Sequence, residues 1–285
     1  MFKNIIIPIS SEFYREEVFR TGVFLAKKFN STINLIYIIE EKTLDQTEKR
    51  LNSFRTDFDK EEMKKDIIRR HVHVADSIIF NDAKRLFADN NIPFNGEIVE
   101  GEFSAVIKGQ LDKNRYDLIL MGFEKKCMLN YRLFGEVQVP IWIESGCGDN
   151  SILAVCSNLA PNQKVPEISV KMSKILGWKL HMIYVIDTED AVTVDGSGIR
   201  SERKSERELL TQGHQFIYEM EKKGLTVTLQ KGSLEKETTK TAEDIGAGLV
   251  IIGREQKKKH ILGIPIKSVK KKMAEKCRYS ILFVN

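Results

Sequence analysis

Short apolar runs alternate along the chain with longer stretches in which apolar residues recur every three or four positions. The runs are continuous, as in NIIIPI at 4–9, DLILMG at 117–122 and GLVIIG at 248–253. Such runs are typical of parallel strands that are covered on both faces, and the stretches between them predict helices. Because strand–helix–strand crossovers share one handedness, the pattern predicts a doubly wound α/β fold.

The alternating pattern occurs twice. The block LAKKFNSTINLIYIIE at 25–40 aligns without gaps with MSKILGWKLHMIYVID at 172–187, at an offset of 147. The first apolar runs keep this offset, so Ser10 corresponds to Ser157. Self-similarity on this scale predicts a duplicated domain. We therefore expect two tandem domains, 1–146 and 147–285, each with a mostly parallel five-stranded sheet and helices on both faces.

The connections differ between the halves. Residues 43–90 predict a long helix that follows an extra excursion, whereas 192–206 are poor in apolar residues and predict a mobile loop before a helix that ends near Lys223. From Gly122 to Pro140 the chain runs only 18 residues, against 27 from Gly253 to Ser280. The first half thus has too little chain for the helix that should precede its last strand, and the second half retains it.

Composition narrows the class of protein. A chain of 285 residues that is 42% hydrophobic suits a globular protein of about two domains. No apolar run approaches the roughly 18 residues that span a membrane, and no cleavage signal is visible, so we expect a cytoplasmic protein. Four cysteines without a CxxC pair predict neither a disulfide framework nor a zinc site. The net charge of the chain is +5, and the excess of positive charge is concentrated in residues 254–278, which hold ten Lys or Arg and two acids.

Six blocks resemble the universal stress protein family in its tandem two-domain form. They are KNIIIPIS, LAKKFNSTINLIYII and DLILMG in the first half and ILAVCSN, LGWKLHMIYVI and LVIIG in the second, and YSILFVN resembles the closing strand. The resemblance implies a stress-response role and, for many members, ATP at the carboxyl ends of the strands. It also implies that PIWIE and YSILFVN pair, giving an internal pseudo-dimer. Unknown protein partners and a homodimer are further expectations.

The family's nucleotide pattern is degraded in both halves. Ser10 and Ser157 stand where the family has an aspartate after its first strand, and a serine lacks carboxylate charge and reach. In the first loop Glu136 replaces a hydroxyl residue after Gly135, so we expect no phosphate there.

The second half keeps more of the pattern. Lysines in the first turn of the helix predicted after Ser268 oppose the helix dipole, and a bound anion would offset that cost. The candidate residues for ATP, phosphate or another anion are Ser157, Gly253, Ser268, Lys270 and Lys271. The alternative is a solvated lysine face.

Nothing in the sequence predicts catalysis or a metal. HExxH, GxxxxGK[ST] and GxSxG patterns are missing, and His71 and His73 would face different sides of a helix. Cys156 is either a reactive thiol or a small buried apolar side chain.

Three functions stay open. The first is a noncatalytic stress-response protein that acts by binding partners and a small anionic ligand. The second is an ATP-binding switch that uses the second half. The third is weak nucleic-acid binding through 254–278, which ranks last because the segment lacks interleaved aromatic residues. No membrane association is expected.

Overall fold

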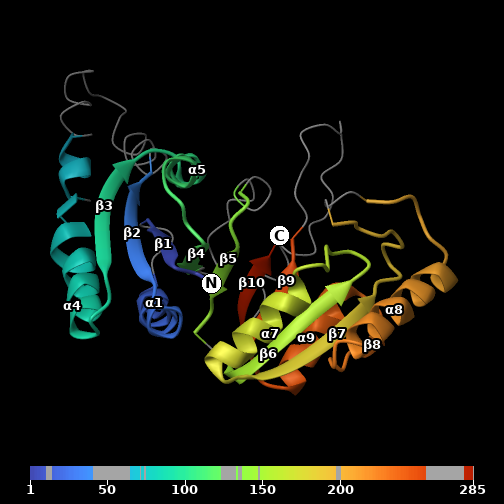
Figure 1. Ribbon diagram of the computed structural model, residues 1–285. Coiled ribbons are helices and arrows are strands. Elements are labelled where there is room, and N and C mark those ends of the chain that lie inside the picture. Colours follow the sequence, from blue (N-terminus) through green and yellow to red (C-terminus); the bar gives the residue numbers. More distant parts are fainter. Residues whose placement is uncertain are drawn as a thin grey trace, which may run out of the picture. The chain divides into compact units, whose positions relative to one another are not determined.

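The computed structural model describes residues 1–10, 15–40, 65–70, 72–73, 75–122, 133, 137–146, 148–196, 200–254 and 279–284, without the side chains of 75–77. By its contacts the chain divides into two compact units, Met1–Asn130 and Tyr131–Asn285. Figure 1 labels their helices and strands. Among the described residues, no helix has both the length and the apolar character needed to cross a bilayer.

The first unit contains a parallel sheet in the order β3-β2-β1-β4. Its elements are β1 (Asn4–Ile9), α1 (Glu16–Phe29), β2 (Thr32–Ile39), the π-helical η1 (Ala75–Phe80), α4 (Asn81–Asp89), β3 (Phe94–Glu100), α5 (Phe103–Lys113) and β4 (Leu118–Gly122). The strand order steps outward from β1 and then returns across it, which is the doubly wound arrangement.

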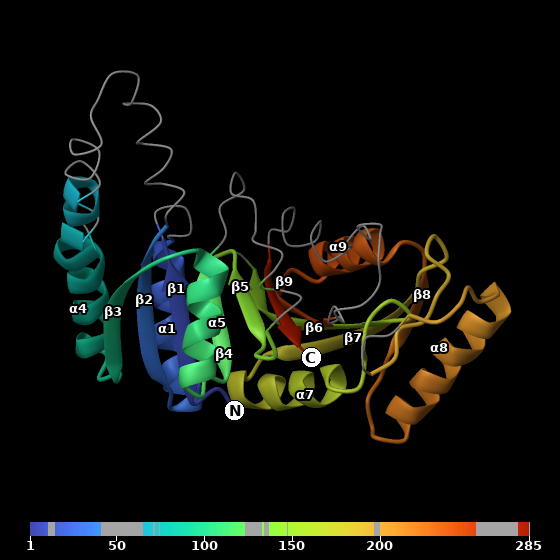
Figure 2. The ribbon, with the colours of Figure 1, turned by 90° about the horizontal axis from the view of Figure 1, so that it is seen from above.

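The core of the first unit follows directly from the apolar pattern. In β1, residues 5–9 are all buried, so both faces of this central strand are covered. Helix α1 buries a stripe that includes Val18, Phe19 and Leu25, and it ends at Asn30, which adopts the left-handed conformation. The ring of Phe19 packs edge-on against that of Phe87 on α4. Right-handed crossovers place α5 on the opposite face from α1 and α4 (Figures 1 and 2).

The second unit contains six strands in the order β5-β10-β9-β6-β7-β8. Its elements are β5 (Ile141–Glu144), β6 (Asp149–Ser157), α7 (Val165–Leu176), β7 (Lys179–Ile186), α8 (Glu206–Glu221), β8 (Thr228–Lys231), α9 (Leu234–Asp244), β9 (Ala247–Gly253) and β10 (Ser280–Val284). All neighbours are parallel except β5 and β10, which pair antiparallel with Leu282 opposite Trp142. Figure 2 shows α7 and α9 on opposite sides of β6 and β7.

The helix ends of the second unit have local causes. Gly177 ends α7 in the left-handed conformation that glycine adopts without strain. At the start of α8, Ser205 and Glu208 form a capping box, in which each side chain bonds the other residue's backbone N–H. The helix ends at Glu221, close to the predicted Lys223.

These elements confirm the predicted doubly wound α/β fold with mostly parallel strands and helices on both faces. Each half of the sequence contributes five strands, β1–β5 and β6–β10. The predicted boundary after residue 146 marks where the repeat begins and stays a prediction. The division by contacts falls earlier, at Asn130, because β5 pairs with β10 and is counted in the second unit.

The two long connections that follow β2 and β7 are partly described. The described residues between Val192 and α8 form a loop, as predicted, in which Val194 bridges to Arg200 and the Val194 N–H bonds the Asn158 carbonyl at 2.8 Å. The mobility of this loop stays a prediction. In the long connection of the first half, residues 65–70 and 72–73 are helical and lead to η1 and α4. Residues 41–64 lie outside the described part of the chain.

The predicted loss of a helix before β5 concerns residues that are only partly described. Residues 137–140 are not helical, and β5 begins at Ile141. One helical-type bond joins the Val137 N–H to the Leu133 carbonyl at 3.2 Å. Residues 123–132 and 134–136 lie outside the described residues, so the loss of this helix stays a prediction.

Candidate functional site

The carboxyl end of β6 is closed by its own loop. Ser157 is fully buried, and its hydroxyl accepts the Leu159 N–H at 3.1 Å and donates to Asn158 Oδ1 at 3.4 Å. Asn162 closes the turn twice, because its Oδ1 accepts the Ser157 N–H at 3.0 Å and its Nδ2 donates to the Ser157 carbonyl at 2.9 Å. The Ser157 hydroxyl and backbone are thus engaged within residues 157–162.

Asp187, directly after β7, anchors this end of the sheet. Its side chain is 3% exposed, and Oδ2 accepts the Leu234 N–H at 2.7 Å at the start of α9. Its Oδ1 accepts the N–H groups of Glu189 and Asp190 at 2.9 and 3.0 Å. A carboxylate at a helix N-terminus is favoured by the helix dipole. Asp187 therefore holds a position that an exogenous anion could otherwise take.

Gly253, the last residue of β9, lies against the β6–α7 loop. A Cβ atom added there would lie 1.8 Å from the carbonyl oxygen of Pro161. The loop backbone can approach β9 this closely only because residue 253 has no side chain. This close packing is sufficient to explain why residue 253 is a glycine, and no phosphate contact is needed to account for it.

The first unit also has a buried acid at the end of its second strand and a closely packed glycine at the end of its fourth. Ser10, after β1, donates its hydroxyl proton to Glu40 Oε1 at 2.8 Å, and both side chains are buried. Glu40 follows β2 and corresponds to Asp187 in the repeat. A Cβ added at Gly122 would lie 2.9 Å from side-chain atoms of Arg15 and Val18, so this glycine also serves close packing.

Arg254 differs from the rest of the basic segment that it begins. It is 2% exposed, and one guanidinium nitrogen donates to the carbonyls of Val137 and Val139 at 2.8 and 3.1 Å. Burial lowers the pKa of this guanidinium to about 10, so it remains cationic at neutral pH. Arg254 therefore holds the segment before β5 and offers no charge to a nucleic acid.

The predicted ligand residues separate into two groups. Ser157 and Gly253 are both packed against residues 158–162, which brings the tips of β6 and β9 together through that loop. Ser268, Lys270 and Lys271 lie outside the described residues, as does the rest of 255–278. Their part in binding ATP or another anion stays a prediction.

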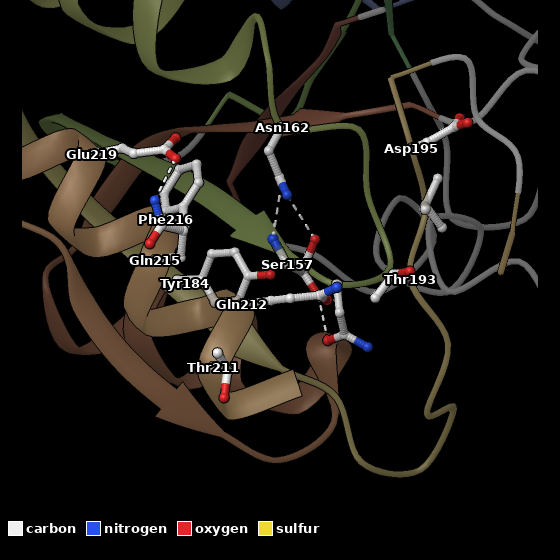
Figure 3. A pocket seen from close by; sticks show the side chains of 12 residues that line it. Ser157, Asn162, Tyr184, Thr193, Asp195, Thr211, Gln212, Gln215, Phe216 and Glu219 are labelled. Carbon is white, nitrogen blue, oxygen red and sulfur yellow. Dashed lines mark hydrogen bonds between the residues drawn. The ribbon is translucent and has the colours of Figure 1, made fainter. Parts of the chain in front are cut away.

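A cavity of about 510 Å³ opens beside Ser157 (Figure 3). Its walls come from the tip of β6 and its loop, from β7, from the segment before α8 and from α8 itself. The lining residues are Ser157, Asn158, Asn162, Tyr184, Thr193, Val194, Asp195, Thr211, Gln212, Gln215, Phe216 and Glu219. Ser157 is therefore both a predicted ligand residue and part of this wall.

Of the two roles predicted for Cys156, a reactive thiol or a small buried apolar side chain, the structure favours the second. It is fully buried in β6, and burial raises the pKa of its thiol. A thiol that stays protonated is a poor nucleophile. Within the described part of the chain, no group of three His, Cys, Asp or Glu side chains could hold a metal ion.

The comparison with protein families identifies the first half. Residues 1–141 match the sequence model of the universal stress protein family. This half of the chain belongs to that family. No curated protein matches the sequence.

Solved structures resemble the chain over nearly its whole length. A universal stress protein from Archaeoglobus fulgidus DSM 4304 superposes with a TM-score of 0.64 at 13% identity, covering 98% of this chain and 98% of its own. A functionally unknown protein from Pseudomonas aeruginosa PAO1 gives 0.65 at 11% identity, covering 99% and 92%. At such low identity these similarities show the fold alone, and they extend it over both halves.

Within this universal stress protein fold, sequence reasoning missed the two buried acids at the strand tips. The signal was present, because both repeat blocks end in an acid, Glu40 and Asp187. It also missed that Arg254 belongs to the core, although this residue directly follows an apolar strand. The cavity wall formed by 193–195 had no signal in the sequence, since that segment reads as polar loop.

Proposed function

We propose that the chain is a noncatalytic stress-response protein, built from two universal stress protein domains, that acts in the cytoplasm by binding partners. Family membership of the first half and the fold of both halves support this proposal. The observation that carries it is the acidic, internally bonded rim in each half. Ligands of open α/β sheets bind at this rim, outside the carboxyl ends of the strands.

The rim chemistry disfavours a nucleotide. In the first unit the buried Glu40 accepts the Ser10 hydroxyl, and in the second unit Asp187 accepts three backbone N–H groups. A triphosphate would lie near these carboxylates in surroundings of low dielectric constant, where like charges repel strongly. It would also need donors that the chain already engages. The halves therefore retain the scaffold of the family and fill its rim with their own side chains.

The rim also disfavours hydrolysis. The hydroxyls of Ser10 and Ser157 are buried and hydrogen-bonded to neighbouring side chains. The Cys156 thiol is fully buried as well. The Ser10 and Ser157 hydroxyls are engaged by neighbouring side chains and the thiol is enclosed, which supports a binding role over a catalytic one.

Nucleotide titration tests the proposal against its ATP alternative. The full chain should release no nucleotide on denaturation after purification, and calorimetric titration with MgATP should give no saturable heat. It should also show no ATPase activity above a heat-treated sample. One equivalent of bound ATP would overturn the proposal and favour the switch. Parallel titrations with inorganic phosphate and with DNA oligonucleotides over a range of salt concentrations test the basic segment, whose anion binding stays a prediction.

The proposed binding of partner proteins is tested by a separate measurement. Quantitative cross-linking of the tagged full chain in its native cells, before and after stress, should recover a set of proteins whose yield changes with stress. Light scattering on the purified chain measures the expected homodimer separately. A set that stays unchanged under every stress applied would contradict the stress-response role.

A further inference from the structure

We infer that the cavity beside α8 binds a neutral, hydroxyl-rich ligand of the size of a mono- or disaccharide. This inference goes beyond the proposed function, because it concerns the space between β7 and α8, which shares only Ser157 and its loop with the rim where the family pattern places a nucleotide. It rests on the size of the cavity, on the charge of its lining and on polar atoms that the protein leaves available.

The charges of the lining residues disfavour an anionic ligand. None of the twelve described lining residues is Lys, Arg or His, and two of them, Asp195 and Glu219, are acids. A phosphate or carboxylate ligand would find no cation here and would be repelled by both side chains. Neutral hydroxyl groups, in contrast, can donate hydrogen bonds to carboxylate oxygens.

The framework of the cavity is fixed by amides that bond the backbone. Asn158 Oδ1 accepts the Asp187 N–H at 2.7 Å, and its Nδ2 donates to the Val192 carbonyl at 2.7 Å. Asn162 is engaged in the same way with Ser157. These contacts tie the segment before α8 to the tip of β6, so the wall of the cavity exists before any ligand binds.

Other polar atoms of the lining are available. Tyr184 is 4% exposed, yet within the described residues its hydroxyl has no hydrogen-bond partner. Figure 3 shows this hydroxyl pointing toward Ser157 and Gln212. The side chains of Gln212 and Thr193 likewise make no hydrogen bond to another described residue. A hydroxyl can both donate and accept, so the Tyr184 hydroxyl offers a ligand in the cavity a hydrogen-bonding group that no described residue uses.

The remaining features select the class of ligand. The rings of Tyr184 and Phe216 lie 5.0 Å apart between centroids and give one wall an apolar surface. Glu219 already accepts a hydrogen bond from Gln215 Nε2 at 2.9 Å, so its charge is partly engaged and less suited to hold a cation. Apolar ring faces beside amide and hydroxyl groups match the apolar faces and hydroxyl rims of a sugar ring. The volume of about 510 Å³ lies within the range of small-molecule sites.

The test uses the full chain and a panel of neutral sugars. Saturation-transfer NMR with glucose, ribose, maltose and trehalose should detect at least one ligand, and titration should give its affinity. The phosphorylated form of that sugar should bind at least about tenfold more weakly, because the two acids of the lining repel its charge. Adenosine and spermidine complete the panel as a nucleoside and a cation.

Two variants locate the binding. Tyr184→Phe removes only a hydroxyl without a protein partner, so sugar affinity should fall about tenfold while the unfolding midpoint stays unchanged. Gln212→Leu should weaken binding similarly, and His214→Leu, on the same helix outside the lining, should leave it unchanged. The inference is overturned if no sugar binds, if the sugar and its phosphate bind equally, if only adenosine or spermidine binds, or if Tyr184→Phe leaves the affinity of the bound sugar intact.

Discussion

At the scale of single residues, buried polar groups at the strand tips determine how the second unit holds together. Asp187 joins the turn after β7 to the distant start of α9, because its carboxylate bonds the N–H groups of Glu189, Asp190 and Leu234. Its equivalent Glu40 holds Ser10 in the first unit. Each acid acts on the fold in the place where relatives of this architecture commonly bind ligands.

Replacing Asp187 tests this role. Asp187→Ala leaves three backbone donors without their acceptor, and hydrogen bonds to charged groups are worth more than neutral ones, so the free energy of unfolding should fall by about 3 kcal/mol. Asp187→Asn keeps one acceptor oxygen and should lose about half as much. Urea unfolding measures both, with the exposed Asp112→Ala as a control that should change stability by less than about 0.5 kcal/mol. A loss below that limit for Asp187→Ala would contradict the role.

The buried thiol of Cys156 gives a prediction for pH. Burial raises its pKa above the ordinary value of 9.0, so the folded protein keeps the proton that the unfolded chain releases. The stabilising contribution is complete below about pH 9 and is lost as the pH rises further. Compared with Cys156→Ala, the wild-type free energy of unfolding should therefore fall more steeply between pH 9 and 10.5, by at most about 1.4 kcal/mol per pH unit.

A chemical measurement checks the same thiol. In a chain whose other three cysteines are replaced by serine, a thiol reagent should label Cys156 only as fast as the protein unfolds. Rapid labelling of the folded chain at pH 7 would show that the thiol is accessible, contrary to its burial.

At the scale of elements, the glycines that end β4 and β9 decide how closely loops and helices approach the strands. Gly253 faces a backbone oxygen, which cannot move aside, whereas Gly122 faces side chains of Arg15 and Val18, which can. Gly109, inside α5, has no atom within 4 Å of a Cβ position. The three positions offer a graded set of alanine substitutions.

Alanine should affect these three positions differently. Gly253→Ala should lower the free energy of unfolding by about 3 kcal/mol or more, and Gly122→Ala by about 1–2 kcal/mol, since overpacking displaces the neighbours. Gly109→Ala should raise it by roughly 0.5–1 kcal/mol, because alanine is the better helix former. Denaturant unfolding measures all three. If Gly253 served only a phosphate, Gly253→Ala would leave stability unchanged.

The sequence predicted elements well where burial imposes a pattern. Continuous apolar runs gave β1, β4, β6 and β9, and the repeat aligned them correctly. The sequence did not predict the hydrogen bonds that hold the loop at 192–206, because bonds such as that of Asn158 to Val192 leave no periodic pattern. The same reason limits the prediction of the candidate site. The sequence placed Ser157 correctly at the end of a strand, but it did not predict the hydrogen bonds that enclose this residue.

At the scale of the whole molecule, the repeat in the sequence and the division by contacts describe different boundaries. The repeat begins after residue 146, but by contacts residues 137–146 belong to the second unit. Glu144 accepts bonds from the Ser280 hydroxyl at 3.0 Å and from Trp142 Nε1 at 2.9 Å, and β5 pairs with β10. A duplicated sequence thus shares its closing strands, which covers the edge of β10.

Two truncated chains test which boundary is structural. A chain of residues 131–285 retains β5, whereas 147–285 lacks it, leaves one edge of β10 open and removes the Val137 and Val139 carbonyls from the buried Arg254. Because the shorter chain loses the buried apolar residues of β5 together with two acceptors of Arg254, it should be less stable by roughly 3–5 kcal/mol. Its open strand edge should also make it associate with rising concentration. Thermal unfolding and light scattering on both chains measure these differences, and equal midpoints with two monomers would show that residues 131–146 are dispensable to the second unit.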